Sequence, residues 1–382
     1  MTDDLEVSVV LPCLNEEDAI GGCINKVKDC LAREKIKGEI IVADNGSTDN
    51  SVEIARSLGA RIAPEPRKGY GSAYLRGIAQ AQGRYIIMAD SDNTYDLGDI
   101  PAFLEKLRQG CGLVIGSRFK GKINKGAMSW SHRYIGNPIL SGMCRLFFNT
   151  KLSDIHCGMR GISAEAFRKM RLRTLGMEFA TEMVVSALQN NIKTCEIPIT
   201  YYPREGYSKL KALPDAWRHI RFMLLYCPAW LYLIPGLVGF VSGIFLMVFL
   251  ILKGTFLFLG HRWDVHLAVF ASAMSILSYQ VLNLGIYAHN FAITQRLLKP
   301  DKFTLAFQRH FTLERGLLLG ASLFLAGFIT DALIVAEWFS KHFGPLYRIR
   351  ESVFAMTLLV IGLQTIFSSF FISLLFLKRK HS

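Results

Sequence analysis

The chain has 382 residues, long enough for two domains of ordinary size, and 51% of them are hydrophobic. Its formal net charge of +13 at pH 7 can indicate nucleic-acid binding, but many of the positive residues flank long apolar blocks. Because basic residues beside apolar blocks are typical of membrane spans and anionic headgroups, the composition favours a membrane protein and argues against a nucleic-acid-binding one.

The first 210 residues alternate short apolar runs with amphipathic stretches. Runs rich in β-branched residues predict buried strands, and the stretches between them predict helices. The predicted strands are Val7–Leu11, Glu39–Ala43, Arg61–Ala63 and Tyr85–Ala89, and the predicted helices are Glu17–Arg33, Ser51–Ser57 and Ser72–Gln82. Such alternation predicts a doubly wound α/β fold with a mostly parallel sheet.

Polar side chains follow three of these strands. Asn15 and Glu16 come after the first, Asp44 ends the second, and Asp90 and Asp92 come after the fourth. Ligands of open α/β sheets bind at the carboxyl ends of the strands, so we expect these side chains to converge there. The chain lacks both a G-x-G-x-x-G signature after the first strand and a P-loop, which argues against a dehydrogenase and an ATPase.

Asp90-Ser91-Asp92 is the centre of the predicted site. Two carboxylates at i and i+2, on a turn after a strand, can face one hard divalent cation such as Mg²⁺ or Mn²⁺. Such a cation would neutralise a departing nucleoside diphosphate. A polar turn without a metal gives the same pattern, and it is the preceding strand and the other acids that favour the metal site.

Short motifs stand in a fixed order along residues 6–210. They are P-x-x-N-E from Pro12, D-N-G-S-T-D from Asp44, K-G-Y-G from Lys68, D-S-D from Asp90, G-S-R from Gly116, D-I-H-C-G-M-R from Asp154 and P-R-E-G-Y-S-K from Pro203. Together they resemble the family 2 GT-A glycosyltransferases. The last three resemble the polyprenyl-phosphate branch of that family, which includes dolichyl-phosphate mannose synthases. The resemblance implies a Rossmann-like GT-A catalytic domain.

The resemblance also implies roles for single residues. Asp90 and Asp92 would hold the metal and, with Arg118, form the catalytic set. The donor-binding set would be Pro12, Leu14, Asn15, Glu16, Val42, Asp44, Lys68, Ser91, Arg204 and Lys209. The acceptor-binding set would be Arg118, Arg133, Asp154, Arg160 and Ser208. Alternatives stay open: Asp44 can merely cap its own turn, and Asp154 with Arg160 can form a structural ion pair. Lys68 can belong to a simple turn, and Arg118, Arg204 and Lys209 can be solvated surface charges.

The implied reaction is an inverting transfer of a hexose from a nucleotide sugar, GDP-mannose or UDP-glucose, to a polyprenyl phosphate. Thr94 departs from the pattern, because mannose synthases of this branch often carry Gln there, and this leaves the donor open. One alternative is a processive polysaccharide synthase, but the Q-x-x-R-W motif of those enzymes is missing. The other is a non-catalytic sensor of lipid phosphate or sugar nucleotide, but both aspartates of the metal site are present.

Four apolar blocks in the second half are each long enough to span a bilayer. They run near Ala229–Leu252, Leu267–Ile293, Leu317–Ala336 and Val353–Leu377. An even number of spans places both ends on one side, and the positive residues are enriched before the first block, between the second and third, and after the fourth. With an N-terminus unlike a signal peptide, this predicts a multi-pass protein of the cell membrane with the catalytic domain and both termini in the cytoplasm.

The predicted domains are a catalytic domain at 1–210, an amphipathic juxtamembrane helix at 211–228 and a four-helix transmembrane domain at 229–378. The stretch Trp130–Phe148 is a second candidate for a helix lying on the lipid bilayer. The eight cysteines form no C-x-x-C pair and stand mostly in apolar contexts, which predicts reduced cytosolic thiols. Four spans can anchor a monomer or build a homo-oligomer.

Overall fold

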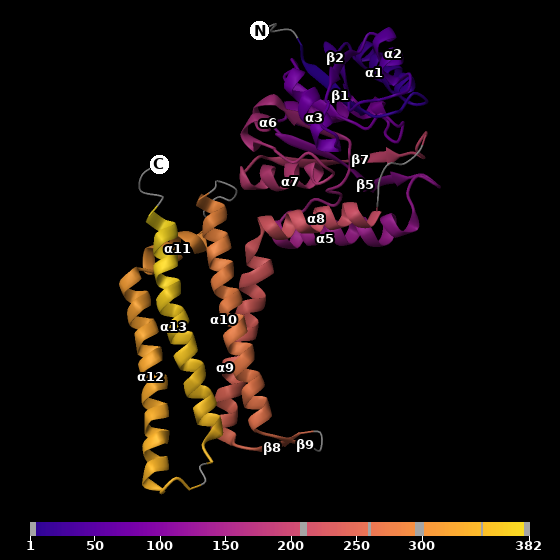
Figure 1. Ribbon diagram of the computed structural model, residues 1–382. Coiled ribbons are helices and arrows are strands. Elements are labelled where there is room, and N and C mark those ends of the chain that lie inside the picture. The colour runs from indigo at the N-terminus through magenta and orange to yellow at the C-terminus, as the bar shows by residue number, and fades with distance from the viewer. Residues whose placement is uncertain (1–4, 207–211, 259–260, 295–301, 345–346, 378–382) are drawn as a thin grey trace. The chain divides into compact units, whose positions relative to one another are not determined.

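The computed structural model describes residues 5–206, 212–258, 261–294, 302–344 and 347–377 (Figure 1). The chain divides into two compact units, unit 1 (Met1–Met223) and unit 2 (Leu224–Ser382). Ser208 and Lys209, which the sequence predicts to bind acceptor and donor, lie outside the described residues.

Unit 1 is built on a seven-stranded sheet with the order β3-β2-β1-β4-β6-β5-β7. The central strand β1 is a continuous apolar run, and it is buried along nearly its whole length because helices cover both faces of the sheet. β6 pairs antiparallel with β4 and β5, and the other strand pairs of this sheet are parallel. The strands are β1 (Val7–Cys13), β2 (Gly38–Asp44), β3 (Arg61–Pro64), β4 (Tyr85–Met88), β5 (Leu113–Ile123), β6 (Arg160–Ser163) and β7 (Thr194–Tyr201).

The predicted elements of unit 1 are confirmed with small shifts of their ends. β1 and β2 are each two residues longer than predicted. The first helix begins at Ile20, three residues after the predicted Glu17. The helices are α1 (Ile20–Arg33), α2 (Ser51–Ser57), α3 (Tyr70–Gln80), η1 (Leu97–Asp99), α4 (Ile100–Arg108), η2 (His132–Gly136), α5 (Asn137–Phe148), α6 (Ala164–Met170), α7 (Phe179–Gln189) and α8 (Ala212–Tyr226). The mostly parallel α/β fold expected from the sequence is therefore present.

Helix α3 packs closely on the middle of the sheet. A Cβ added at Gly77 would lie 2.5 Å from Val10 Cγ1 on β1, so glycine permits this approach. The same close packing carries Tyr70 and Tyr74, at the first turns of α3, to the carboxyl ends of β1 and β4, where the polar residues gather.

Two cysteines of unit 1 form a disulfide, which corrects the prediction that all eight are reduced. Cys111 and Cys195 have Cα atoms 6.1 Å apart, and they meet because parallel pairing of β5 with β7 brings the starts of the two strands together. Five further cysteines are buried thiols, namely Cys13, Cys23, Cys30, Cys144 and Cys157. Burial raises the pKa of Cys157 to about 12, which suits an inert apolar residue.

Unit 2 is helical. Four of its helices are long and apolar enough to cross a membrane, at Ala229–Lys253, Val265–Thr294, Leu313–Ser340 and Ile349–Phe376. At most 33% of the apolar window of each is buried inside the chain, so most of the apolar surface faces outward. The elements are η3 (Ala229–Leu233), α9 (Ile234–Lys253), β8 (Phe256–Phe258), β9 (His261–Trp263), α10 (Val265–Thr294), α11 (Lys302–His310), α12 (Leu313–Ser340) and α13 (Ile349–Leu377).

Small and hydroxyl-bearing residues mediate the helix contacts of unit 2. A Cβ at Gly320 on α12 would lie 2.8 Å from the carbonyl oxygen of Gly362 on α13, so these backbones approach closely. Ser272 on α10 and Thr357 on α13 share a hydrogen bond of 2.7 Å between their hydroxyls. Both devices are typical of helices that associate in lipid, where apolar burial supplies little driving force.

Helix α8 has one buried and one exposed face within unit 1. Leu213 and Trp217 are 85% and 58% exposed, whereas His219 is buried and its Nδ1 lies 2.8 Å from the hydroxyl of Thr181 on α7. Apolar residues thus lie on the exposed face of α8 as well as on the face packed against unit 1, and contact of this helix with the membrane stays a prediction.

Candidate active site

The polar residues that follow β1, β2 and β4 meet at one edge of the sheet, as the sequence predicts. β1 and β2 run in parallel register with Cys13 opposite Asp44, and β1 and β4 do so with Val10 opposite Met88. The segments after Cys13, Asp44 and Met88 therefore emerge side by side. Arg204, which follows β7, reaches the same place and contacts two of the acids.

Asp44 and Asn15 build the loop between β2 and α2. The Asp44 carboxylate accepts hydrogen bonds from the backbone N–H groups of Gly46 and Ser47 at 3.1 and 3.0 Å. Asn15, whose φ is +52°, accepts one from the N–H of Thr48 at 2.7 Å. These contacts give Asp44 the turn-capping role left open above, and its contact with a nucleotide stays a prediction.

Lys68 lies against the same loop. Its ammonium donates hydrogen bonds to the carbonyl oxygens of Asn45 and Gly46 at 2.8 and 3.3 Å. The following Gly69 has φ +144°, and a Cβ there would lie 2.2 Å from the carbonyl oxygen of Leu175. Glycine is therefore required for the turn that places Lys68 beside the Asp44 loop.

Asp90 is held by two tyrosines that the sequence reasoning did not single out. The hydroxyls of Tyr70 and Tyr74 donate to Asp90 Oδ1 at 3.0 and 3.3 Å. Burial, and then the neighbouring Asp92 carboxylate, raise the pKa of Asp90 to about 7. The signal was present in the sequence, because Tyr70 belongs to the K-G-Y-G motif and Tyr74 follows it by one helical turn.

Asp92 is engaged at both oxygens. Its Oδ1 accepts hydrogen bonds from the hydroxyl and the N–H of Thr94, at 2.5 and 3.2 Å. Its Oδ2 lies 3.0 Å from Arg204 Nη1. Thr94, which marks the departure from the mannose synthase pattern, thus orients the second aspartate.

Ser91 and Pro12 join the carboxylate turn to the end of β1. The Ser91 hydroxyl donates to the carbonyl oxygen of Pro12 at 2.6 Å, so Ser91 is a structural link in this state. Leu14, two residues after Pro12, is half-buried. Val42 is fully buried in β2. The Val42 side chain is part of the sheet core, and a contact of Val42 with the donor stays a prediction.

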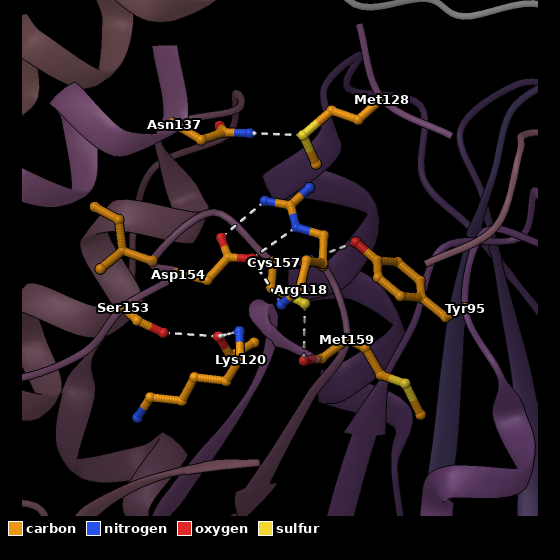
Figure 2. A network of polar contacts seen from close by, with 12 residues as sticks. Tyr95, Arg118, Lys120, Met128, Asn137, Ser153, Asp154, Cys157 and Met159 are labelled. Atoms are coloured by element: carbon orange, nitrogen blue, oxygen red, sulfur yellow. Dashed lines mark hydrogen bonds and ion pairs between the residues drawn. The ribbon is translucent and has the colours of Figure 1, made fainter. Parts of the chain in front are cut away.

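Arg118 and Asp154 form a buried bidentate ion pair. Arg118 Nε and Nη2 lie 2.7 and 2.8 Å from the two carboxylate oxygens of Asp154, and the two residues are 7% and 0% exposed. The Arg118 guanidinium also lies over the ring of Tyr201, 5.2 Å from its centroid. Figure 2 shows this pair with the hydroxyl of Tyr95, which accepts a hydrogen bond from the Gly158 N–H at 2.8 Å.

Arg160 does not pair with Asp154, which corrects one of the two readings of these residues. Its guanidinium donates to the carbonyl oxygens of Cys157, Ala180 and Ile155 at 2.7–2.8 Å, and the residue is 1% exposed. All three nitrogens are used in this way, so Arg160 fixes the loop that carries Asp154 and Gly158. Its contact with an acceptor stays a prediction.

Arg133 contacts an aromatic ring, not the Arg118–Asp154 pair. It is half-buried on η2, and its guanidinium lies 5.4 Å from the ring centroid of Tyr134. Tyr134 and Trp130 are 59% and 67% exposed. The structure thus joins Arg133 to an exposed aromatic patch, and its contact with an acceptor stays a prediction.

The carboxylate pair fits a divalent cation by the chemistry of its donors. Asp90 and Asp92 offer hard oxygen ligands, and the mutual repulsion that raises the pKa of Asp90 is what a cation between them would relieve. Within the described residues no group of three or more His, Cys, Asp or Glu side chains could enclose a metal ion. Two protein ligands suit Mg²⁺ or Mn²⁺ that shares its remaining positions with water and phosphate oxygens.

A sheet of this order with two aspartates beyond β4 defines the class of nucleotide-sugar glycosyltransferases of the GT-A type. Residues 8–171 match the sequence family "Glycosyl transferase family 2". Residues 286–376 match the family "Glycosyltransferase family 2 C-terminal transmembrane region". The low-salt glycan biosynthesis hexosyltransferase Agl6 of Haloferax volcanii is 37% identical over 365 residues, which cover 95% of this chain and 87% of that protein.

Two further Haloferax volcanii proteins are similar. The glycosyltransferase AglJ is 30% identical over 73% of this chain and 91% of its own length. A dolichyl-phosphate hexose transferase is 29% identical over 54% of this chain and 87% of its own length. The chain therefore belongs to glycosyltransferase family 2, and it is a membrane protein and an enzyme that transfers sugar.

Among solved structures, glucosyl-3-phosphoglycerate synthase from Mycobacterium tuberculosis, crystallised with Mn²⁺, uridine diphosphate and glucosyl-3-phosphoglycerate, has 23% sequence identity and a TM-score of 0.47. The likeness covers 58% of this chain and 80% of that one.

Proposed function

We propose that this enzyme transfers a hexose from a nucleotide sugar to a polyprenyl phosphate, with inversion at the anomeric carbon and with a divalent cation. The observation that carries the proposal is the convergence of Asp90 and Asp92 with the basic Arg204 at the carboxyl edge of the sheet. The same chain also has helices long and apolar enough to cross a membrane. The name of the dolichyl-phosphate hexose transferase relative supports the lipid acceptor.

In the proposed reaction an acceptor phosphate oxygen attacks the anomeric carbon of the donor sugar. The bond from that carbon to the diphosphate oxygen breaks, and the nucleoside diphosphate leaves with the electron pair. A phosphate monoester has a second pKa near ~6, so the acceptor is already anionic at neutral pH and no strong general base is needed. The reaction then depends on orientation and charge stabilisation.

Each basic and acidic residue has a role in this scheme. Asp90 and Asp92 would hold Mg²⁺ or Mn²⁺, which would neutralise charge on the leaving diphosphate. Glu16, Asp44 and Lys68 line the donor edge of the sheet, with Asn15 and Pro12 shaping its loops. Arg118, oriented by Asp154, is the cation that we assign to the acceptor phosphate, and Arg133 lies near the exposed aromatic patch.

The same proposal places the reaction at the cytoplasmic face of the cell membrane. The bias of positive residues toward one set of loops supports this orientation. GDP-mannose and UDP-glucose remain the two donors that we consider first.

The test is a panel of labelled GDP-mannose, UDP-glucose and UDP-N-acetylglucosamine with a short polyprenyl phosphate, in Mn²⁺, in Mg²⁺ and in EDTA. We expect one donor to give a lipid-linked product that EDTA and Asp92→Asn both abolish. The matched control is Asp99→Asn, because Asp99 lies on η1 away from the carboxylate pair. A polymeric product would indicate a processive synthase, and no product with any donor would favour a sensor.

A further inference from the structure

Arg204 lies across two acids that come from different strands. Its Nη2 pairs with Glu16, which follows β1, and its Nη1 lies 3.0 Å from Asp92 Oδ2, which follows β4. Arg204 itself follows β7 and is only partly exposed, with 23% of its side chain accessible. A single guanidinium therefore bridges the donor edge of the sheet and the second metal carboxylate.

The backbone around Arg204 is tied to the same turn. The Glu205 N–H donates to the carbonyl oxygen of Asp92 at 3.1 Å, and the Tyr202 N–H donates to that of Thr94 at 2.9 Å. The Glu205 carboxylate accepts a hydrogen bond from the Asn93 side chain at 2.6 Å. These contacts hold Arg204 in place, so its position over Asp92 is built into the fold.

This position conflicts with cation binding. Thr94 occupies Asp92 Oδ1 and Arg204 occupies Oδ2, so a cation can take Asp92 only by displacing a contact. On Asp90, Oδ1 is taken by the two tyrosines, and Oδ2 accepts no hydrogen bond from any residue that the structure describes. A hydroxyl can share a carboxylate with a cation, whereas a guanidinium carries positive charge and repels it.

We propose that Arg204 is a positioning residue that occupies Asp92 in the nucleotide-free enzyme and competes with the divalent cation for that carboxylate. The inference deepens the proposed function, because it rests on the same metal site. A diphosphate offers the guanidinium another anionic partner with bidentate geometry. Nucleotide binding would then release Asp92, so that cation and nucleotide each strengthen the binding of the other.

The inference is tested by Mn²⁺ binding to the full chain in detergent, without nucleotide or acceptor, followed by loss of the electron paramagnetic resonance signal of free Mn²⁺. We expect Arg204→Gln to bind Mn²⁺ at least ~5-fold more tightly than the wild type, since the competing charge is removed. Arg204→Lys keeps the charge and should stay close to the wild type. Asp92→Asn should lose most of the binding.

The matched control is Arg108→Gln, which breaks an arginine–carboxylate pair with Glu6 at the opposite end of β1. We expect it to leave Mn²⁺ binding unchanged. Should Arg204→Gln misfold, Asn93→Ala loosens the same segment by freeing Glu205, and it should tighten Mn²⁺ binding at least ~2-fold.

A second titration adds a nucleoside diphosphate. We expect it to tighten Mn²⁺ binding by a larger factor in the wild type than in Arg204→Gln, because only the wild type has a guanidinium to release. Equal or weaker Mn²⁺ binding by Arg204→Gln, or equal tightening by Arg204→Lys, would overturn the inference. Because no sugar or acceptor is present, that outcome is independent of whether hexose transfer occurs.

Discussion

At the scale of single residues, Asp90 is the group whose chemistry depends most on its neighbours. Burial raises its pKa to about 7, and the hydroxyls of Tyr70 and Tyr74 act in the opposite direction by donating to the charged form. The two tyrosines thus favour the ionised form of Asp90, and both of them bind its Oδ1.

Removing one of these hydroxyls should shift the pH dependence of transfer. Tyr74→Phe deletes a donor to the carboxylate, so the pKa of Asp90 rises further and more of the enzyme carries a protonated Asp90 at pH 7. We expect the acid limb of the rate profile to move to higher pH and the rate at pH 7 to fall about tenfold. Tyr85→Phe, at the far end of β4, is the control, and an unshifted profile in Tyr74→Phe would contradict this role.

Removing one partner of the Arg118–Asp154 pair should be strongly destabilising, because the charge left behind is buried. Asp154→Ala leaves the Arg118 guanidinium buried without its partner, which should cost about 3 kcal/mol or more. The change is measured as a lower midpoint of thermal unfolding in detergent. Glu6→Ala breaks the exposed pair with Arg108 and should cost less than ~1 kcal/mol, so equal losses in the two variants would argue against the buried pair.

At the scale of elements, α8 is attached to α7 through a histidine that must stay neutral. Burial lowers the pKa of His219 to about 4, and burial also holds the pKa of the adjacent His156 well below its ordinary value. The rings of the two histidines meet edge to face with centroids 4.4 Å apart. Protonating either ring would place a charge in this buried contact.

This contact should make the protein less stable in mild acid. A histidine whose pKa is lowered by folding binds its proton more readily in the unfolded state, so stability falls as the pH drops from about 6.5 toward 4. For His219 alone the loss between pH 7 and pH 4 should be about 3 kcal/mol. In His219→Gln the unfolding midpoint should depend less on pH in that range, and an unchanged dependence would rule out His219 as its source.

The stretch η2–α5 presents a second apolar face. Ile135, Ile139 and Leu146 are 45%, 55% and 58% exposed, while Leu140 and Cys144 on the other side of the helix are buried in unit 1. Exposed apolar residues beside Trp130 and Arg133 are typical of a helix at a lipid interface. The sequence makes this stretch the second candidate for a helix on the bilayer, and its contact with lipid stays a prediction.

Lipid contact at this face can be measured directly. A spin label is attached to a cysteine introduced by Ile139→Cys, in a chain that also carries Cys227→Ser so that the partly exposed Cys227 is not labelled. In lipid nanodiscs this label should collide with oxygen more often than with a water-soluble nickel complex. The control is a label at Arg56, whose side chain is 64% exposed on α2. We expect the reverse preference there, and equal preferences at both positions would argue against bilayer contact at α5.

At the scale of the whole molecule, strands and helices marked by long apolar runs could be predicted from the sequence. The buried runs of the first 90 residues predicted β1 to β4 with only small errors at their ends, and the apolar blocks predicted the four long helices of unit 2. Local sequence also located the site, because polar residues at the carboxyl ends of parallel strands must meet.

Contacts between distant segments were not predictable in the same way. The disulfide between Cys111 and Cys195 depends on the pairing of β5 with β7, and the pairing of Asp154 with Arg118 depends on how a loop folds over the sheet. The three carbonyl oxygens around Arg160 could not be predicted from sequence, because every residue has a backbone carbonyl oxygen. The bridge of Arg204 between Glu16 and Asp92 joins residues 188 positions apart.

The central claim is that hexose is transferred to a lipid phosphate by direct displacement, and the structure of the product tests it most directly. The lipid product formed from an α-linked sugar nucleotide is purified and analysed by mass spectrometry and by phosphorus and proton magnetic resonance. We predict one hexose joined to one phosphate through a phosphodiester in the β configuration. An α-linked product, a lipid diphosphate or a chain of several sugars would contradict the account.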